Sequence, residues 1–286
     1  MKRTTIFPPE RVTIVGILNA TPDSFSDGGR FVRARARVDL AAVLEVAAGL
    51  IEEGAHVLDV GGESTRPGAV QVPVELEIAR TAPVIEALCK RFDTPLSIDT
   101  RKAEVADAAL EAGASWVNDV SGLGHDPELG RVAARHGAGI ILGHLRGTPD
   151  TMQNDPRFDD VLAEVAHELG RSVDRALEAG VPRDQIAVDP GIGFGKHLEH
   201  NLVLLAGVGR LREALGLPIL VGPLRKSFLG ELTGDPVEQR DEATWAACAV
   251  AAFLGADAVR VHRADGAVRA VRVGRALRKA RPEDPA

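Results

Sequence analysis

The chain alternates between two patterns of apolar and polar residues. Residues 13–18 (TIVGIL) form a mostly apolar run rich in β-branched side chains, which suits a buried strand and is too short for a helix. Over residues 37–53 the apolar side chains instead recur every three or four positions, which predicts an amphipathic helix. Gly54 then stands where a helix C-cap is expected. One strand followed by one helix is therefore the first unit of the chain.

The same unit repeats to the end of the sequence. Strands are predicted at residues 13–18, 56–60, 95–98, 116–120, 139–142, 186–188, 219–221 and 258–261, and helices at 37–53, 74–91, 103–112, 127–136, 158–179, 202–215, 244–254 and 267–280. Eight such units without a linker predict a (β/α)8 TIM barrel, a single α/β domain over residues 1–286. We expect residues 1–10 and 281–286 to be flexible tails. An open doubly wound sheet is the main alternative, and it is disfavoured because no second domain and no clean dinucleotide motif occur.

Every predicted strand ends in polar residues. In chain order these are Asn19, Asp59, Asp99, Asn118 with Asp119, His144, Asp189, Arg225 with Lys226, and Arg260 with His262. A single Asp or Asn at such a place commonly caps a turn or a helix. Because the carboxyl ends of barrel strands carry the active site, eight polar endings together favour one shared pocket.

The polar strand ends fall into two chemical groups. Asp99, Asn118, Asp189 and Lys226 are directional donors and acceptors that suit a flat, nitrogen-rich heterocycle. Asn19, Arg66, Arg260 and His262 form a cationic and amide set that suits phosphate oxygens, with Mg²⁺ as a companion because it prefers oxygen ligands. Ser227 is expected to open a helix or turn whose free N–H groups would accept a small carboxylate. These groups predict a ligand with a heterocycle, a diphosphate and a small anion.

Other motifs do not support other chemistries. Gly191, Gly193 and Gly195 are spaced G-x-G-x-G, so the third glycine of a dinucleotide motif would fall on Lys196. His197 and His200 have no third metal ligand nearby and suit a solvated helix start. No serine lies in the G-x-S-x-G motif of a nucleophilic hydrolase.

Composition and charge exclude several partners. The net charge of −7 and the pI near 5.7 argue against nucleic acid or a polybasic membrane contact. The Met-Lys-Arg start is not followed by an apolar signal segment, and the longest apolar stretch, residues 245–254, is too short to span a bilayer. Only Cys89 and Cys248 occur, so we expect no disulfide framework and a cytoplasmic location.

Two long motifs identify a family resemblance. Residues 16–29 read GILNATPDSFSDGG and residues 59–69 read DVGGESTRPGA, and both closely resemble signatures of the dihydropteroate synthase family. The segments SIDTRKAEV, VNDVSG, DPGIGFGK, RKSFLG and RVH match the same family in the same order. The resemblance extends over residues 12–276. It implies a pterin-binding TIM barrel that acts in folate biosynthesis, is inhibited by sulfonamides and forms a homodimer.

The resemblance also implies a reaction and its residues. The family condenses 6-hydroxymethyl-7,8-dihydropterin diphosphate with 4-aminobenzoate, giving 7,8-dihydropteroate and pyrophosphate through departure of the diphosphate before the amine attacks. Carried over by position, the pterin is held by Asp99, Asn118, Asp189 and Lys226, the diphosphate by Asn19, Thr65, Arg66, Arg260 and His262, Mg²⁺ by Asn19, and the aminobenzoate by Phe25, Thr65, Pro67, Phe194 and Ser227. Asn19, Asp99, Lys226, Arg260 and His262 would form the catalytic set. The loops at residues 22–35 and 61–73 would exclude water.

Three residues depart from the family pattern. Leu224 stands where a Ser is usual, Gly143 where a Met is usual, and Arg263 where an Asp is usual. None of them removes a residue assigned above, but they leave open a pterin-binding paralogue without turnover. A corrinoid-dependent methyltransferase barrel is disfavoured, because Asn19, Arg260 and His262 would have no role there.

Overall fold

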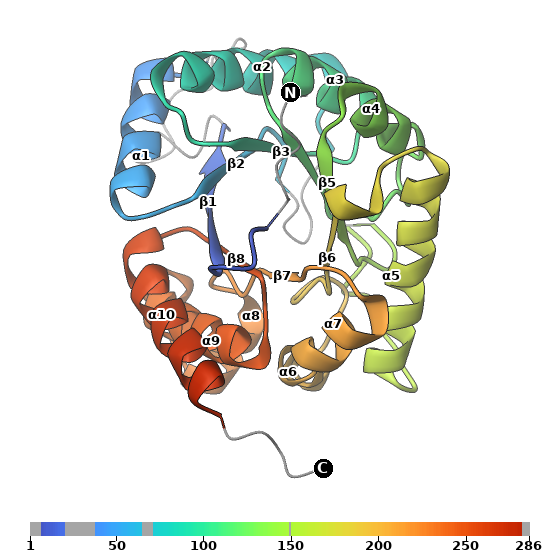
Figure 1. Cartoon of the computed structure of the whole chain (residues 1–286), viewed down its shortest axis with the longest axis vertical. Coiled ribbons are helices and arrows are strands. Elements are labelled where there is room, and N and C mark those ends of the chain that lie inside the picture. The colour runs from blue at the N-terminus through green and yellow to red at the C-terminus, as the bar shows by residue number, and fades with distance from the viewer. Residues whose placement is uncertain (1–6, 21–37, 65–70, 149, 282–286) are drawn as a thin grey trace.

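Eight parallel strands form one barrel, which confirms the predicted fold class (Figure 1). The computed structural model describes residues 7–20, 38–64, 71–148 and 150–281. The strands are β1 (Thr13–Asn19), β2 (Val57–Gly61), β3 (Leu96–Asp99), β4 (Trp116–Asp119), β5 (Gly139–Gly143), β6 (Ile186–Asp189), β7 (Leu220–Val221) and β8 (Ala258–Val261). Their order is β6-β5-β4-β3-β2-β1-β8-β7, and a parallel bridge between Val188 and Ile219 brings β6 beside β7. The open-sheet alternative is therefore wrong.

Helices surround the strands, as right-handed crossovers require (Figure 1). They are α1 (Leu40–Glu52), α2 (Val74–Arg91), α3 (Ala103–Glu111), α4 (Glu128–His136), α5 (Val161–Glu178), α6 (Leu198–Ala206), α7 (Val208–Leu215), α8 (Ser227–Thr233), α9 (Asp241–Leu254) and α10 (Ala264–Ala280), with short 3-10 turns at Arg183–Gln185 and Val237–Gln239. No helix in the described ranges is long and apolar enough to cross a membrane.

Local sequence explains where several helices begin and end. Asp39 and Asp160 precede α1 and α5, and each carboxylate accepts hydrogen bonds from two backbone N–H groups of the first turn. Gly137 ends α4 in the left-handed conformation at φ +64°. The helix predicted at 202–215 is instead two helices divided at Gly207, where a Cβ would lie 2.4 Å from Leu162 Cδ1. α8 begins at Ser227, which confirms the expectation that Ser227 opens a helix or turn, although this seven-residue helix is not among the eight predicted from the apolar pattern.

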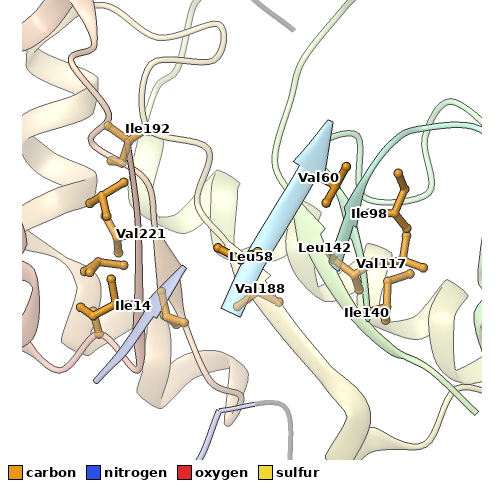
Figure 2. Close-up of a cluster of buried hydrophobic side chains, with 14 of the residues drawn as sticks. Ile14, Leu58, Val60, Ile98, Val117, Ile140, Leu142, Val188, Ile192 and Val221 are labelled. Carbon is orange, nitrogen blue, oxygen red and sulfur yellow. The ribbon is translucent and has the colours of Figure 1, made fainter. Parts of the chain in front are cut away.

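The larger hydrophobic core lies between the strands and the helices. Ile14, Leu58, Ile98, Ile140 and Val188 are fully buried there, and Figure 2 shows these side chains with their neighbours on adjacent strands. Because side chains alternate along a strand, these residues face the helices while the residues between them face the barrel interior.

A second, smaller cluster fills the barrel interior. It is called here the amino-terminal plug and consists of Phe7, Val15, Val57, Trp116, Ile141, Ala187, Leu220 and Ala258. The rings of Phe7 and Trp116 meet edge to face with centroids 5.3 Å apart, and Phe7 is only 2% exposed. The expected flexible tail over residues 1–10 is therefore wrong at Phe7. Residues 1–6 and 282–286 lie outside the described residues.

Candidate active site

The strand register brings several predicted site residues into one row. Asn19 pairs with Gly61, Gly61 with Asp99, and Asp99 with Asn118, across the neighbouring strands β1 to β4. Gly61 carries no side chain in this row, and a Cβ there would lie 3.8 Å from Asn19 Oδ1 and 3.7 Å from Asp99 Cβ. The side chains of Asn19 and Asp99 thus lie close together on either side of Gly61, at the carboxyl end of the barrel strands.

A network of buried polar side chains lies at and beneath this row. It is called here the polar floor and consists of Asp59, Ser97, Asp99, Asn118 and Arg260. Asp59 Oδ1 accepts from Ser97 Oγ at 2.5 Å, and its Oδ2 accepts from Asn118 Nδ2 at 2.9 Å and Arg260 Nε at 2.6 Å. Arg260 Nη2 also donates to Asp99 Oδ2 at 2.6 Å. Charge-assisted hydrogen bonds of this kind hold Asp99 and Asn118 in fixed orientations.

Asp99 retains one oxygen for a ligand. Its Oδ1 is buried and has no hydrogen-bond partner among the described residues. Burial raises the pKa of Asp99 to about 7, against the effect of Arg260 and with a further increase from Asp59. Buried polar atoms in native proteins are almost always satisfied, so an unpaired carboxyl oxygen at a strand end marks a place for an N–H donor from a ligand.

Arg260 remains charged at the centre of the floor. Burial lowers the pKa of Arg260, but the carboxylates of Asp59 and Asp99 outweigh that effect and the pKa is raised. The sequence placed Arg260 with the diphosphate, and the structure adds two carboxylate partners that orient its guanidinium.

Asp189 and Lys226 occupy the other side of the mouth. Asp189 ends β6, and its Oδ1 accepts a hydrogen bond from Gly191 N at 2.7 Å, while burial raises its pKa. Lys226 Nζ lies 3.5 Å from the centre of the Phe194 ring. The Lys226 stem lies against Gly193, where a Cβ would come within 2.5 Å of Lys226 Cδ. Burial lowers the pKa of Lys226 to about 7, although Asp189 opposes the change.

A second buried network supports the Phe194 loop from below. Lys196 Nζ donates to the Phe194 carbonyl at 2.8 Å and lies 3.0 Å from His144 Nδ1, while His144 Nε2 lies 2.9 Å from Glu168 Oε2. Burial lowers the pKa of His144 to about 4 and that of Lys196 to about 7. A neutral His144 can therefore accept from Lys196 and donate to Glu168, whose pKa the His144 hydrogen bond lowers to about 2.

Comparison with known proteins identifies the family. The model of the family described as pterin binding enzyme matches residues 15–262. The chain belongs to the pterin-binding enzyme family. A dihydropteroate synthase of Synechocystis is 46% identical over 269 residues, which cover 94% of this chain and 91% of that protein.

Solved structures of dihydropteroate synthases have the same fold as this chain. A Yersinia pestis dihydropteroate synthase in a sulfonamide drug complex has a TM-score of 0.87 and 40% identity, covering 95% of this chain and 96% of its own. A Xanthomonas albilineans dihydropteroate synthase with 4-aminobenzoic acid has a TM-score of 0.85 and 43% identity, covering 96% of this chain and 95% of its own.

Other residues named from the sequence lie at or beyond the limits of the described structure. Phe25, Thr65, Arg66 and Pro67 lie outside the described residues, so their assigned roles stay predictions. His262 directly follows β8 and is half-buried, and Ser227 is the exposed first residue of α8. No group of three or more His, Cys, Asp or Glu residues able to hold a metal occurs in the described part of the chain.

Four residues that support the site have no ligand role in the sequence analysis, although Asp59 is among the predicted polar strand ends. Asp59 and Ser97 each stand two positions before a mouth residue of the same strand, so alternation places them on the same inward face. A polar side chain inside an otherwise apolar strand is the signal that could have identified them. Lys196 ends a glycine-rich run, and Glu168 lies within α5 with no local feature to mark it.

The structure shows the surroundings of the three residues that depart from the family pattern. A Cβ at Gly143 would come within 2.6 Å of Val120 Cα, so the close approach of two backbones requires glycine there. The Arg263 guanidinium lies 5.7 Å from the Trp245 ring on the helical layer and pairs with Asp265. Leu224 adopts a left-handed backbone at φ +33°, directly before the Arg225-Lys226 pair.

Proposed function

We infer that the chain is a dihydropteroate synthase, which condenses 6-hydroxymethyl-7,8-dihydropterin diphosphate with 4-aminobenzoate to give 7,8-dihydropteroate and pyrophosphate. The observation that carries this conclusion is Asp99, which has one buried oxygen without a hydrogen-bond partner among the described residues while its other oxygen is fixed by Arg260. A carboxyl in this state suits the adjacent N–H groups of a pterin ring. The 46% identity to a dihydropteroate synthase over 94% of this chain supports the same activity.

We propose the following roles for the pterin residues. Asp99 and Asn118 accept and donate along one edge of the ring, and Asp189 and Lys226 hold the opposite side. The polar floor and the Lys196 network keep these groups oriented before the substrate arrives, so little reorganisation is needed during the reaction. A fixed carboxylate set also stabilises the positive charge that develops on the pterin methylene when the diphosphate leaves.

We propose that Asn19, Arg260 and His262 bind the diphosphate, with Thr65 and Arg66, and that Mg²⁺ accompanies it. Asn19 offers a carboxamide oxygen at the end of β1, and Mg²⁺ in such sites takes one or two protein oxygens and completes its shell with phosphate oxygens and water. The donor set therefore fits the ion. Bound there, Mg²⁺ would neutralise charge on the leaving diphosphate.

Turnover of the two substrates tests the proposed function. Purified protein is incubated with Mg²⁺, the pterin diphosphate and 4-aminobenzoate, and both pyrophosphate and dihydropteroate are measured. We expect stoichiometric formation of both products and competitive inhibition by a sulfonamide against 4-aminobenzoate. Pterin binding by calorimetry without either product would instead support the pterin-binding paralogue without turnover.

We propose further that the protein is a homodimer through the face formed by α9 and α10. Val250, Val273 and Leu277 are 47%, 58% and 57% exposed there, and with Ala249 and Phe253 they line an apolar groove of about 230 Å³. Light scattering of Leu277→Arg should report a monomer. Leu232→Arg, at an equally exposed apolar position on α8, should leave the dimer intact.

We also propose a cytoplasmic location. Both cysteines are free thiols, and burial raises the pKa of Cys248 to about 12, so that thiol stays protonated. Cell fractionation tests this location.

A further inference from the structure

The turn that presents Lys226 has an unusual backbone. Leu224 and Arg225 are consecutive non-glycine residues at φ +33° and +49°, between the end of β7 and the start of α8. Side chains other than glycine disfavour the left-handed region because Cβ approaches the backbone, so two such residues in succession need support from outside the turn. Lys226 is the next residue, so the backbone of this turn determines the direction in which the Lys226 side chain leaves the chain.

The support comes from the start of α9. Arg225 Nε and Nη2 donate to the two carboxylate oxygens of Asp241, each at 2.7 Å, in a bidentate pair. Arg225 N donates to Thr244 Oγ1 at 3.0 Å, and the Arg225 carbonyl accepts from Arg240 Nη1 at 3.2 Å. Both the side chain and the backbone of Arg225 are thus tied to the first turn of one helix.

The position of Lys226 depends on this attachment. Its Nζ lies above the Phe194 ring and its stem lies against Gly193, so the lysine spans the gap between the β7–α8 turn and the β6–α6 loop. Relaxation of Leu224 and Arg225 toward an ordinary backbone conformation would rotate the following residue away from Phe194.

We propose that Arg225 and Asp241 are positioning residues for the synthase reaction: their ion pair holds the strained turn and thereby sets Lys226 against the pterin site. This inference rests on the proposed function. Asp241 lies outside the mouth of the barrel and acts through Arg225 and the backbone of Lys226, without touching the substrate.

The chain contains a matched control pair. Arg212 and Asp257 form a second bidentate pair, with Nε to Oδ2 at 2.9 Å and Nη2 to Oδ1 at 3.1 Å. Asp257 directly precedes β8 at the amino-terminal end of the barrel, far from the strand ends that carry the site. Loss of either pair removes a bidentate arginine–aspartate interaction; Asp257 Oδ2 also accepts from Ile219 N at 2.9 Å, a bond that an asparagine can keep. Only the Arg225–Asp241 pair bears on Lys226.

The experiment compares Asp241→Asn and Arg225→Lys with Asp257→Asn and Arg212→Lys. We expect about a 10-fold lower kcat/KM and weaker pterin binding for the first two variants, because small displacements of a contacting group cost one to two orders of magnitude in rate. The control variants should stay within about 2-fold of wild type at a similar loss in Tm. Leu224→Gly added to Asp241→Asn should recover part of the lost activity, since glycine tolerates the left-handed turn.

A double-mutant cycle with Lys226→Ala decides whether the pair acts through the lysine. If the inference holds, Asp241→Asn costs almost nothing further in kcat/KM or in pterin affinity once Lys226 is removed. An equal cost in both backgrounds, or an equal cost at Asp257, would overturn it. A wild-type protein without turnover would overturn the proposed function alone, because pterin affinity measured by calorimetry still completes the same cycle.

Discussion

The two ends of one barrel carry opposite chemistry on the same inward face of the strands. In β4, Trp116 lies in the amino-terminal plug, and Asn118, two residues later on the same face, belongs to the polar floor. In β2, Val57 and Asp59 show the same change. The switch therefore occurs over one step of the side-chain alternation, about 7 Å along a strand.

The difference separates stability from catalysis. Apolar contacts in the plug, such as that between Phe7 and Trp116, stabilise the fold because their burial removes surface from water. Buried charges such as Asp59 and Arg260 lose hydration, and their ion pair does little more than offset this loss. The polar floor is instead a preorganised support for the ligand-binding side chains.

Arg260→Met should produce the largest effect and break the separation, because it removes the cation between two buried carboxylates. Asp59 and Asp99 would remain buried without their partner, which costs about 3–5 kcal/mol in free energy of unfolding. We expect loss of turnover as well, by on the order of 10³-fold, since Asp99 loses its orientation. Urea unfolding and steady-state kinetics measure the two effects. A variant as stable as wild type would contradict the structural role given to Arg260.

Phe7→Ala should affect stability alone. Removal of a buried aromatic ring costs about 3–4 kcal/mol in free energy of unfolding. We expect kcat/KM at low temperature, where the variant remains folded, to stay within about 2-fold of wild type. Phe7→Leu is the matched control, with a smaller loss of stability. A 10-fold change in kcat/KM for the alanine variant would show that the two ends are coupled.

Lys226→Ala should have the converse effect. The side chain contacts Phe194 and Gly193 at the mouth and contributes little to the packed core, so we expect Tm to change by about 2 °C or less. Pterin affinity and kcat/KM should fall by about 10²-fold, which corresponds to about 2.7 kcal/mol. A large drop in Tm with retained pterin binding would instead assign Lys226 to structure.

The sequence predicts the fold well because its signal is local and repeated. The helix at Val74–Arg91 and the strand at Ala258–Val261 were predicted at their observed bounds, since their apolar periods are complete. The division at Gly207 is not predicted, and the need for glycine there comes from Leu162 on a different helix, whose Cδ1 a Cβ would approach to 2.4 Å. Phe7 was assigned to a tail because nothing adjacent to it reveals that Trp116 lies opposite.

The site is predictable only in part for a similar reason. Strand ends identify Asp99, Asn118 and Asp189, because their position along the chain is sufficient. Pairings such as Arg225 with Asp241, or His144 with Glu168, join residues 16 and 24 positions apart in sequence. Their partners are fixed by packing between elements, and no local pattern predicts that packing.

Lys196→Met should give the smallest effect. It tests whether the pH dependence of the free energy of unfolding arises from buried groups at the carboxyl end of the barrel. Burial lowers the pKa of Lys196 from its ordinary 10.5 to about 7, so between pH 7 and 10 the unfolded chain holds a proton that the folded chain has released. The free energy of unfolding therefore rises with pH over this window. Lys226, whose pKa is also lowered to about 7, contributes with the same sign.

Asp99 does not obscure this window. Its pKa is raised from 3.8 to about 7, so its contribution to the free energy of unfolding decreases as pH rises from about 4 to 7. Well above pH 7 Asp99 is ionised in both states and adds no further change with pH. We expect wild type to gain about 4 kcal/mol in free energy of unfolding between pH 7 and 9, about 2 kcal/mol from each lysine, and Lys196→Met to gain roughly half as much. Urea unfolding at several pH values measures the slopes. Phe7→Ala should shift the whole curve downward without changing its slope, because the plug contains no group that titrates; equal slopes in wild type and Lys196→Met would mean that Lys196 keeps its proton when buried.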